Sequence, residues 1–83
     1  MNKSVEMIEK SIAYIGRSTY PGDDYTLGMV ELAYRLGEIT DEEHMRYTQA
    51  AFDAVQERRA ELRREQSQRR MAEVMARVEG RAA

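Results

Sequence analysis

The feature that most constrains the fold is a helix-stop signal followed directly by a helix-start signal near the middle of the chain. Gly37 follows an apolar helical pattern, at the position where helices often end in a left-handed residue. Ile39 is expected at the C″ position, where the Schellman motif places a hydrophobic contact back to the helix. Thr40 and Glu43 form a T-x-x-E capping box, in which each side chain bonds a free backbone N–H of the next helix. These signals predict a helical hairpin that turns at Gly37-Glu38-Ile39-Thr40.

The second arm of this hairpin is expected to be one long helix. No proline or glycine stands between Thr40 and Gly80, so no local signal breaks the helix, which at 1.5 Å per residue would reach roughly 55–60 Å. Its first half carries an apolar stripe formed by Met45, Thr48, Phe52, Val55 and Leu62, with Ala51 and Ala54 allowing close approach. The stripe then stops, because residues 63–70 contain nothing apolar. A narrow apolar face resumes with Met71, Val74, Met75 and Val78.

Two shorter helices are expected before the turn. The first, over about residues 4–16, has the helical apolar spacing of Val5, Ile8, Ile12 and Ile15. Asn2 or Ser4 is available as its N-cap. A loop follows Gly16, and Pro21-Gly22 in that loop fits the two central positions of a type II turn.

The second helix, over about residues 24–36, begins after Asp23 or Asp24 as its cap. Its apolar residues surround most of its circumference: Tyr25, Leu27, Met29, Val30, Leu32, Ala33, Tyr34 and Leu36. A helix that is apolar nearly all round is buried on several sides, so we expect it at the centre of the fold.

These elements predict an all-α fold, with a short N-terminal helix followed by a helical hairpin whose second arm is one long, partly exposed helix. We expect a three-helix core over residues 1–62, with helices at about 4–16, 24–36 and 41–62. Two short helices cannot cover the whole length of the third. Residues 63–83 are therefore expected to protrude as an arginine-rich helical extension.

Composition excludes several classes of protein. The chain has 83 residues and no cysteine, and its apolar runs are far shorter than the roughly 18–20 residues that span a bilayer. We therefore expect a soluble, cytoplasmic protein. Charged residues make up 34% and hydrophobic residues 42%, which predicts a folded chain with a modest core. A core of this size supplies only about 3–5 kcal/mol, so a partner or self-association is expected.

Charge is divided along the chain. Residues 1–45 hold nine acidic and four basic side chains, a net charge of −5, whereas residues 46–83 hold nine arginines and six acids, a net charge of +3. Glutamates stand among these arginines, which weakens a DNA-binding interpretation, because a DNA-binding helix normally presents a cleaner basic face. Arginine without lysine suits bidentate contacts with carboxylates at protein interfaces. A solvated helix or coiled-coil exterior is the simplest account of residues 63–70.

No constellation of residues predicts catalysis. His44 is the only histidine, and its place in the first turn of a polar helix predicts a solvated side chain. The acids around the turn lack the spacing and central glycine of an EF-hand, so capping explains them better than a metal site. Phosphate-binding loops, dinucleotide fingerprints and nucleophile elbows are also missing from the sequence. We expect neither an enzyme nor a cofactor, metal or small-molecule substrate.

The run Leu32-Ala33-Tyr34-Arg35-Leu36-Gly37-Glu38-Ile39-Thr40-Asp41-Glu42-Glu43 resembles the turn of the SHOCT-type short helical hairpins. Their pattern is a leucine-bearing helix, then Gly-x-Ile-Thr-x-Glu-Glu, then a second helix. The resemblance implies a helical hairpin over these twelve residues. Those hairpins carry an aromatic residue after the acidic pair, where this chain has His44 and Met45. In size and helicity the chain also resembles the small accessory proteins of bacteriophages.

Two hypotheses for function follow. In the first, the chain is a protein-binding module that regulates or inhibits a partner protein, for example a host enzyme or defence complex if a bacteriophage encodes it. The residues expected to bind that partner are Arg58, Arg59, Arg63, Arg64, Arg69, Arg70, Met71, Val74, Met75 and Val78. In the second, the chain is a homodimeric helical protein whose segment Arg58–Arg70 tracks the phosphates of a nucleic acid. Antiparallel pairing would then place acidic halves beside basic halves.

Overall fold

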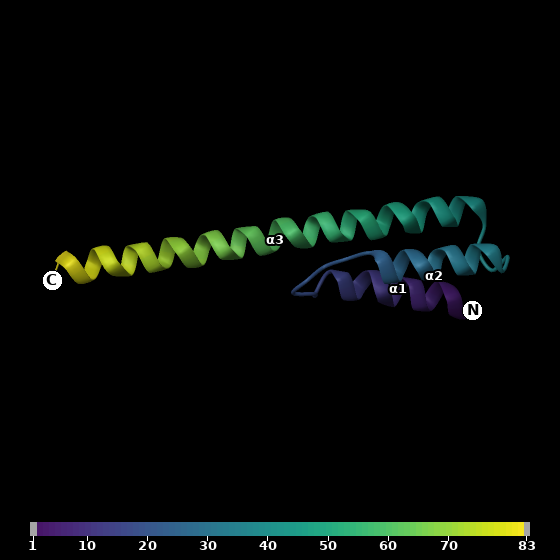
Figure 1. Cartoon of the computed structure of the whole chain (residues 1–83), viewed down its shortest axis with the longest axis horizontal. Helices are drawn as coiled ribbons and strands as arrows, with labels where there is room; N and C mark the ends of the chain where they lie inside the picture. The colour runs from purple at the N-terminus through teal and green to yellow at the C-terminus, as the bar shows by residue number, and fades with distance from the viewer. Residues whose placement is uncertain (1, 83) are drawn as a thin grey trace.

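The structure, a computed structural model, describes residues 2–82, and in that range it contains three helices and no strand. α1 spans Lys3–Ile15, α2 spans Asp24–Arg35 and α3 spans Asp41–Ala82 (Figure 1). The predicted fold class is confirmed: a short N-terminal helix precedes a hairpin whose second arm is one uninterrupted helix of 42 residues. Met1 and Ala83, which the predicted core and extension include, lie outside the described residues.

The molecule is elongated because α3 is much longer than its two neighbours. α1 and α2 lie beside the first half of α3, and the second half continues past the loop that joins α1 to α2 (Figure 1). The radius of gyration is 19.1 Å. A compact chain of this length would have a radius of gyration of about 12 Å. We call residues 63–82 of α3 the extension.

The core is small and lies where the three helices meet. Its buried cluster consists of Ile8, Val30, Ala33, Ile39 and Tyr47, and Val5, Ile12 and Met29 pack against it. The buried hydroxyl of Thr26 is satisfied by the hydroxyl of Ser11, 2.5 Å away. Beyond Leu62, α3 has no buried residue among those that the structure describes. The core therefore ends where the predicted apolar stripe ends.

The turn between α2 and α3 forms the predicted Schellman motif. Gly37 has a φ of 73°, and its N–H donates to the carbonyl oxygen of Tyr34 over 3.0 Å. The N–H of Glu38 donates to the carbonyl oxygen of Ala33 over 2.9 Å, so Glu38 occupies C″. The expected placement of Ile39 at C″ is therefore wrong by one residue, because Glu38 directly follows Gly37 at C′. Ile39 is nevertheless buried against the core.

The restart of the helix also follows the prediction. The N–H of Thr40 donates to the carboxylate of Glu43 over 2.9 Å, and the N–H of Glu43 donates to the hydroxyl of Thr40 over 3.1 Å. This reciprocal pair is the capping box. The start of α1 packs onto the same turn, because the side-chain amide of Asn2 donates to the carbonyl oxygen of Glu38 while its oxygen caps the N–H of Ser4. Asn2 is thus the N-cap of α1.

Two predictions about the burial of helix faces are wrong. α2 was expected to be buried on several sides, yet Tyr25, Leu32 and Leu36 are exposed. A helix that contacts only two neighbours has an uncovered outer face, and α2 contacts only α1 and α3 among the described elements. The apolar residues around α2 therefore lie partly in the core and partly on the surface.

The inner face of α3 also differs from the predicted stripe. Met45 is 71% exposed and Phe52 is 51% exposed, so these two members of the stripe are misplaced. Val55 is buried as predicted, together with Tyr47 and Ala51. These three residues are spaced by four, which places them on one side of the helix. Ala51 is fully buried, and Phe52, the next residue of the helix, points about 100° away from it and is exposed.

The loop between α1 and α2 does not contain the predicted type II turn. Such a turn requires a positive φ at Gly22, and Gly37 is the only residue with a positive φ in residues 2–82. The loop instead runs along the end of the core. Asp23 occupies the N-cap position of α2 without a capping hydrogen bond from its side chain.

Candidate protein-binding surfaces

The extension is exposed along its described length and leaves its apolar face uncovered. Its four apolar side chains are 51–66% exposed: Met71, Val74, Met75 and Val78. Their spacing of i, i+3, i+4 and i+7 places them on one face of the helix. No side-chain hydrogen bond or ion pair recorded within residues 2–82 involves this segment. We call these four residues the apolar stripe.

The arginines are not spread evenly around the extension. Each residue of a helix advances by about 100°, so positions seven or four apart share a flank. This spacing places a row of arginines along one side of the apolar stripe. The arginine row consists of Arg59, which precedes the extension, and of Arg63, Arg70, Arg77 and Arg81. The other side carries Glu61, Glu65 and Glu79. Of the remaining predicted residues, Arg64 lies in line with the stripe and Arg69 lies on the opposite face.

Arg58 has a different role from the other arginines predicted to bind a partner. Its guanidinium Nε donates to the carbonyl oxygen of Ser18 over 2.8 Å, and its Nη1 lies 2.5 Å from the carboxylate of Glu61. The Arg58 side chain is only 14% exposed. Arg58 therefore fastens the α1–α2 loop to α3, and we assign it to the fold. The other predicted contact residues all lie on exposed helix, and their binding role stays a prediction.

His44 is less solvated than the sequence predicts. Its side chain is 28% exposed, its Nε2 lies 3.0 Å from the carboxylate of Glu31, and its ring packs on that of Tyr34 with centroids 4.5 Å apart. Hydrogen bonds from His44 and then Arg35 lower the pKa of Glu31 below its ordinary value. The Tyr34 hydroxyl donates to the carboxylate of Asp41 over 2.6 Å, and this bond raises the pKa of Tyr34. These contacts join α2 to α3 across the hairpin.

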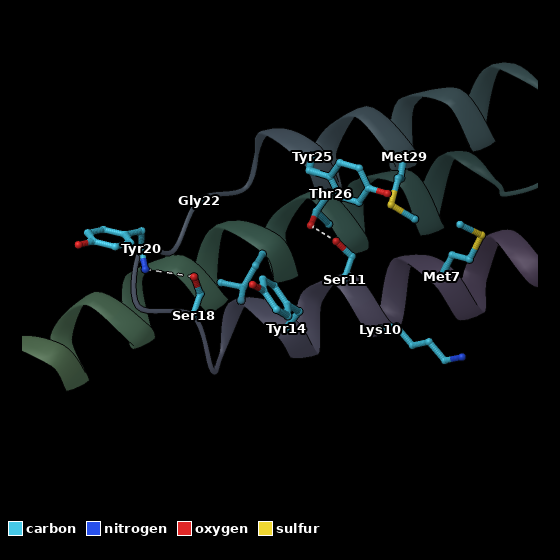
Figure 2. A pocket seen from close by; sticks show the side chains of 11 residues that line it. Met7, Lys10, Ser11, Tyr14, Ser18, Tyr20, Gly22, Tyr25, Thr26 and Met29 are labelled. Carbon is cyan, nitrogen blue, oxygen red and sulfur yellow. Dashed lines mark hydrogen bonds between the residues drawn. The ribbon is translucent and has the colours of Figure 1, made fainter.

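A groove between α1 and α2 was not predicted. Figure 2 shows the side chains around it, with α3 passing behind the two shorter helices. The groove has a volume of about 460 Å³, with Ile15 and Thr26 among its buried lining residues. Exposed apolar and aromatic side chains line much of the rest, chiefly Met7, Tyr14, Tyr20 and Tyr25, together with the half-buried Met29. The surface is thus apolar and open on the side away from α3.

The groove continues along the seam of the two helices. A smaller pocket of about 140 Å³ shares Met7 and Met29 with the first and reaches Leu36 and Glu38 beside the α2–α3 turn. We call the combined surface the α1–α2 groove. The sequence contained a signal for it, because Met7 and Tyr14 lie outside the apolar stripe of α1 and α2 has more apolar residues than one core face needs.

Two classes of site find no support in the described residues. Residues 2–82 contain no cluster of three or more histidine, cysteine, aspartate or glutamate side chains that could hold a metal ion. None of the described helices combines the length and the apolar character needed to cross a membrane. Two exposed apolar surfaces are candidates for binding: the extension and the α1–α2 groove. Comparisons with protein families, with curated proteins and with solved structures found no match to this chain.

Proposed function

We propose that this protein is a non-enzymatic protein-binding module that regulates a partner protein through the extension of α3. The observation that carries the proposal is the apolar stripe, which is half-exposed on a helix without a neighbour. Spacing of i, i+3, i+4 and i+7 is the pattern with which an amphipathic helix enters an apolar groove. We therefore propose that the extension binds, as a helix, in an apolar groove of the partner protein.

Energetics support a binding role for this stripe. Complete burial of a valine or methionine side chain contributes roughly 1.5–3 kcal/mol relative to exposure. An isolated helix of about 20 residues is only marginally stable in water, because forming the first turn is costly. In this protein the extension continues a helix that is already packed in the core, so its first turn is formed. Less ordering entropy is then lost on binding.

The arginine row supports a protein partner with acidic groups beside an apolar groove. A guanidinium forms bidentate bonds with carboxylates and is enriched at protein interfaces. Glutamates lie on the opposite flank of the helix. A partner groove with complementary charges along its two sides would therefore pair favourably with only one orientation of the helix. A small helical inhibitor of a larger host or defence complex, of the kind bacteriophages encode, would use such an asymmetric helix.

A capture experiment with paired variants tests the proposal. The tagged full chain is compared with V74D/V78D, which places two carboxylates in the stripe, and with Q66D/A76D, which adds the same charge on the opposite side. We expect one defined protein to be captured from native cells by the wild type and Q66D/A76D and lost with V74D/V78D. Equal capture by both variants would show that the stripe does not carry recognition.

The arginine row also favours a second candidate, contact of the extension with nucleic-acid phosphates. Each phosphate neutralised contributes about −0.9 to the slope of log K against log salt for duplex DNA. The variant R63Q/R70Q/R77Q should therefore make that slope shallower by about 2.7 if the row tracks phosphates. A wild-type chain that does not bind DNA at low salt would exclude this candidate.

A further inference from the structure

We infer that two copies of this chain pair face to face through their α1–α2 grooves, with α1 of each copy against α2 of the other. This contact goes beyond the proposed function, because it uses no residue of the extension. In the resulting two-fold dimer the four short helices form a central layer, and the two copies of α3 lie on its outer sides. The occupant of each groove is thus the groove face of the second copy.

The apolar surface that α1 and α2 leave uncovered supports this pairing. Six large apolar side chains that line the α1–α2 groove are exposed: Met7, Tyr14, Tyr20, Tyr25, Leu32 and Leu36. Their exposed fractions lie between 54% and 90%. Monomeric soluble proteins rarely expose a continuous apolar patch of more than a few hundred Å². We therefore expect this face to be covered in solution.

The area of the groove face is on the scale that a stable dimer requires. An aromatic side chain buries about 150–250 Å² when it is fully covered. Tyr14, Tyr20 and Tyr25 are 63%, 90% and 76% exposed, so these three side chains alone offer roughly 450 Å². Met7 and the two leucines of the groove bring this area towards the value of about 800 Å² per partner that standard interfaces bury.

The position of α3 leaves room for the second copy. α3 packs on the other side of α1 and α2, and the groove opens away from it (Figure 2). Two chains can therefore meet groove to groove without a collision between their long helices. Because both copies use the same surface, the contact closes at two chains and does not propagate into a filament.

Charges at the edges of the groove favour one of two symmetric pairings. A two-fold axis parallel to the helices sets α1 against α2 of the other copy, whereas a perpendicular axis sets α1 against α1. At 100° per residue, the outer edge of α1 carries a net charge of +1, from Lys3, Glu6 and Lys10. The outer edge of α2 carries a net charge of −1, from Asp24, Glu31 and Arg35. Only the parallel axis brings edges of opposite charge together.

A contact within the chain sets the register of this pairing. The hydroxyls of Ser11 and Thr26 are 2.5 Å apart, which fixes the level of α1 along the antiparallel α2. Counting residues in opposite directions from this pair places Met7 within about 3 Å of the level of Leu32. A rotation about an axis parallel to the helices leaves these levels unchanged. Met7 of one copy therefore faces Leu32 of the other.

The aromatic side chains of the groove match in the same register. By the same count, Tyr14 lies within about 3 Å of the level of Tyr25. The two-fold axis therefore sets Tyr14 of each copy against Tyr25 of the other. Tyrosine pairs of this kind are favourable at interfaces, because the ring is apolar and the hydroxyl keeps a polar contact at the rim.

The dimer leaves both extensions free. At 100° per residue, the apolar stripe lies on the side of α3 roughly opposite the buried Tyr47, Ala51 and Val55, so in both copies it faces away from the central layer. An axis parallel to the helices also preserves the direction of α3, so both extensions project from the same end. The dimer thus presents two apolar stripes, and a partner with two binding sites would be bound with increased avidity.

Sedimentation equilibrium with matched variants tests the dimer. Y25D/L32D places two carboxylates in the groove, and V74D/V78D exchanges two apolar residues for carboxylates in the apolar stripe. We expect the wild type and V74D/V78D to have twice the chain mass of 9.6 kDa, and Y25D/L32D to dissociate at least about 100-fold more readily with unchanged helical circular dichroism. A wild type that is monomeric at every concentration, or a dimer that only V74D/V78D disrupts, would overturn the inference.

The capture experiment separates this dimer from the proposed function. Y25D/L32D keeps the apolar stripe, so it should still capture the partner protein that V74D/V78D loses. Loss of capture in V74D/V78D together with a monomeric wild type would overturn the dimer and support the proposed function. Equal capture by V74D/V78D and a dimeric wild type would support the dimer and overturn the proposed function.

Disulfide trapping tests the pairing of the helices with single substitutions, since the natural chain has no cysteine. Chains with M7C are mixed with chains that carry L32C and are then oxidised. Y14C replaces L32C as the matched control, because pairing of α1 with α1 about an axis near Lys10 would place Tyr14 opposite Met7. We expect the M7C–L32C disulfide to form at least about tenfold faster than the M7C–Y14C disulfide. Equal rates, or a faster M7C–Y14C disulfide, would overturn the pairing.

Discussion

Arg58 on α3 donates a hydrogen bond to the carbonyl oxygen of Ser18, 2.8 Å away, and this contact lies where the supported half of α3 ends. Ser18 belongs to the loop between α1 and α2. After Leu62 no described residue of α3 is buried. The bond therefore marks the boundary between the part of the helix that packs in the core and the part that is exposed on all sides.

The first prediction concerns this boundary. Arg58→Met keeps an unbranched apolar stem but removes the bonds to Ser18 and Glu61, so we expect a loss of about 1.5–3 kcal/mol in the free energy of unfolding. Urea denaturation followed by circular dichroism measures it. Arg59→Met, on the neighbouring exposed position, is the control and should change stability by less than about 0.5 kcal/mol. Equal effects of the two substitutions would show that the bonds of Arg58 do not stabilise the fold.

The second prediction compares two glycines with opposite expected signs. Gly37→Ala should destabilise the protein by about 1–2 kcal/mol, because a φ of 73° is strained for any residue with a Cβ. Gly28→Ala should stabilise it by about 0.4–1 kcal/mol, because Gly28 lies inside α2 and an added Cβ meets nothing within 4 Å. Melting temperatures of the two variants provide the comparison. A stabilising Gly37→Ala would contradict the left-handed turn.

The third prediction tests which face of α3 is buried. Phe52→Ala should cost less than about 1 kcal/mol, although phenylalanine is the larger residue, because Phe52 is 51% exposed. Val55→Ala should cost more, about 1–3 kcal/mol, because Val55 is buried and a cavity would remain. Chemical denaturation of both variants gives the order. The reverse order would show that Phe52 and not Val55 faces the core.

The fourth prediction concerns pH. The folded protein lowers the pKa of Glu31 through hydrogen bonds from His44 and then Arg35. A lowered carboxylate pKa contributes stability that is present above the ordinary value of 4.5 and is lost as the pH falls through the folded pKa. The stability difference between the wild type and Glu31→Gln should therefore shrink between about pH 7 and about pH 3. Urea titrations at both pH values measure it, and a constant difference would exclude the linkage.

The fifth prediction concerns removal of residues 63–83. The core contacts and both helix caps lie upstream, so the truncated chain should keep a cooperative thermal transition. Its free energy of unfolding should change by less than about 0.5 kcal/mol, because no described residue of α3 beyond Leu62 is buried. Calorimetry measures the transition. Loss of the transition at every concentration would show that the core needs the extension.

The hairpin could be predicted because its signals are local. Gly37 and Thr40 act on backbone groups within five residues of themselves, so their roles hold whatever else packs nearby. The uninterrupted α3 follows from the same kind of argument, since the absence of a breaker is a property of the chain alone. The placement of Ile39 at C″ was one position too far along the chain, because Glu38 directly follows Gly37 at C′.

Which faces of α2 and α3 are buried could not be predicted as reliably as the hairpin. α2 and α3 each have apolar residues on more than one side, and periodicity does not say which side meets a neighbour. The packing of the three helices decided the matter, because it leaves Phe52, Leu32 and Leu36 exposed while Ala51 is buried. The α1–α2 groove results from which faces of the helices are left exposed. No single helix contains it.

Sequence by itself thus determined the elements of this protein: three helices, one turn, and a long arm that two short helices cannot cover. Only the tertiary structure decided which arginine is structural and which apolar residues remain free to bind. The physical reason is the separation along the chain of the residues that interact. Caps and breakers act over a few neighbouring residues, whereas the Arg58 to Ser18 bond and the groove join residues that are distant in the chain and adjacent only after the helices pack.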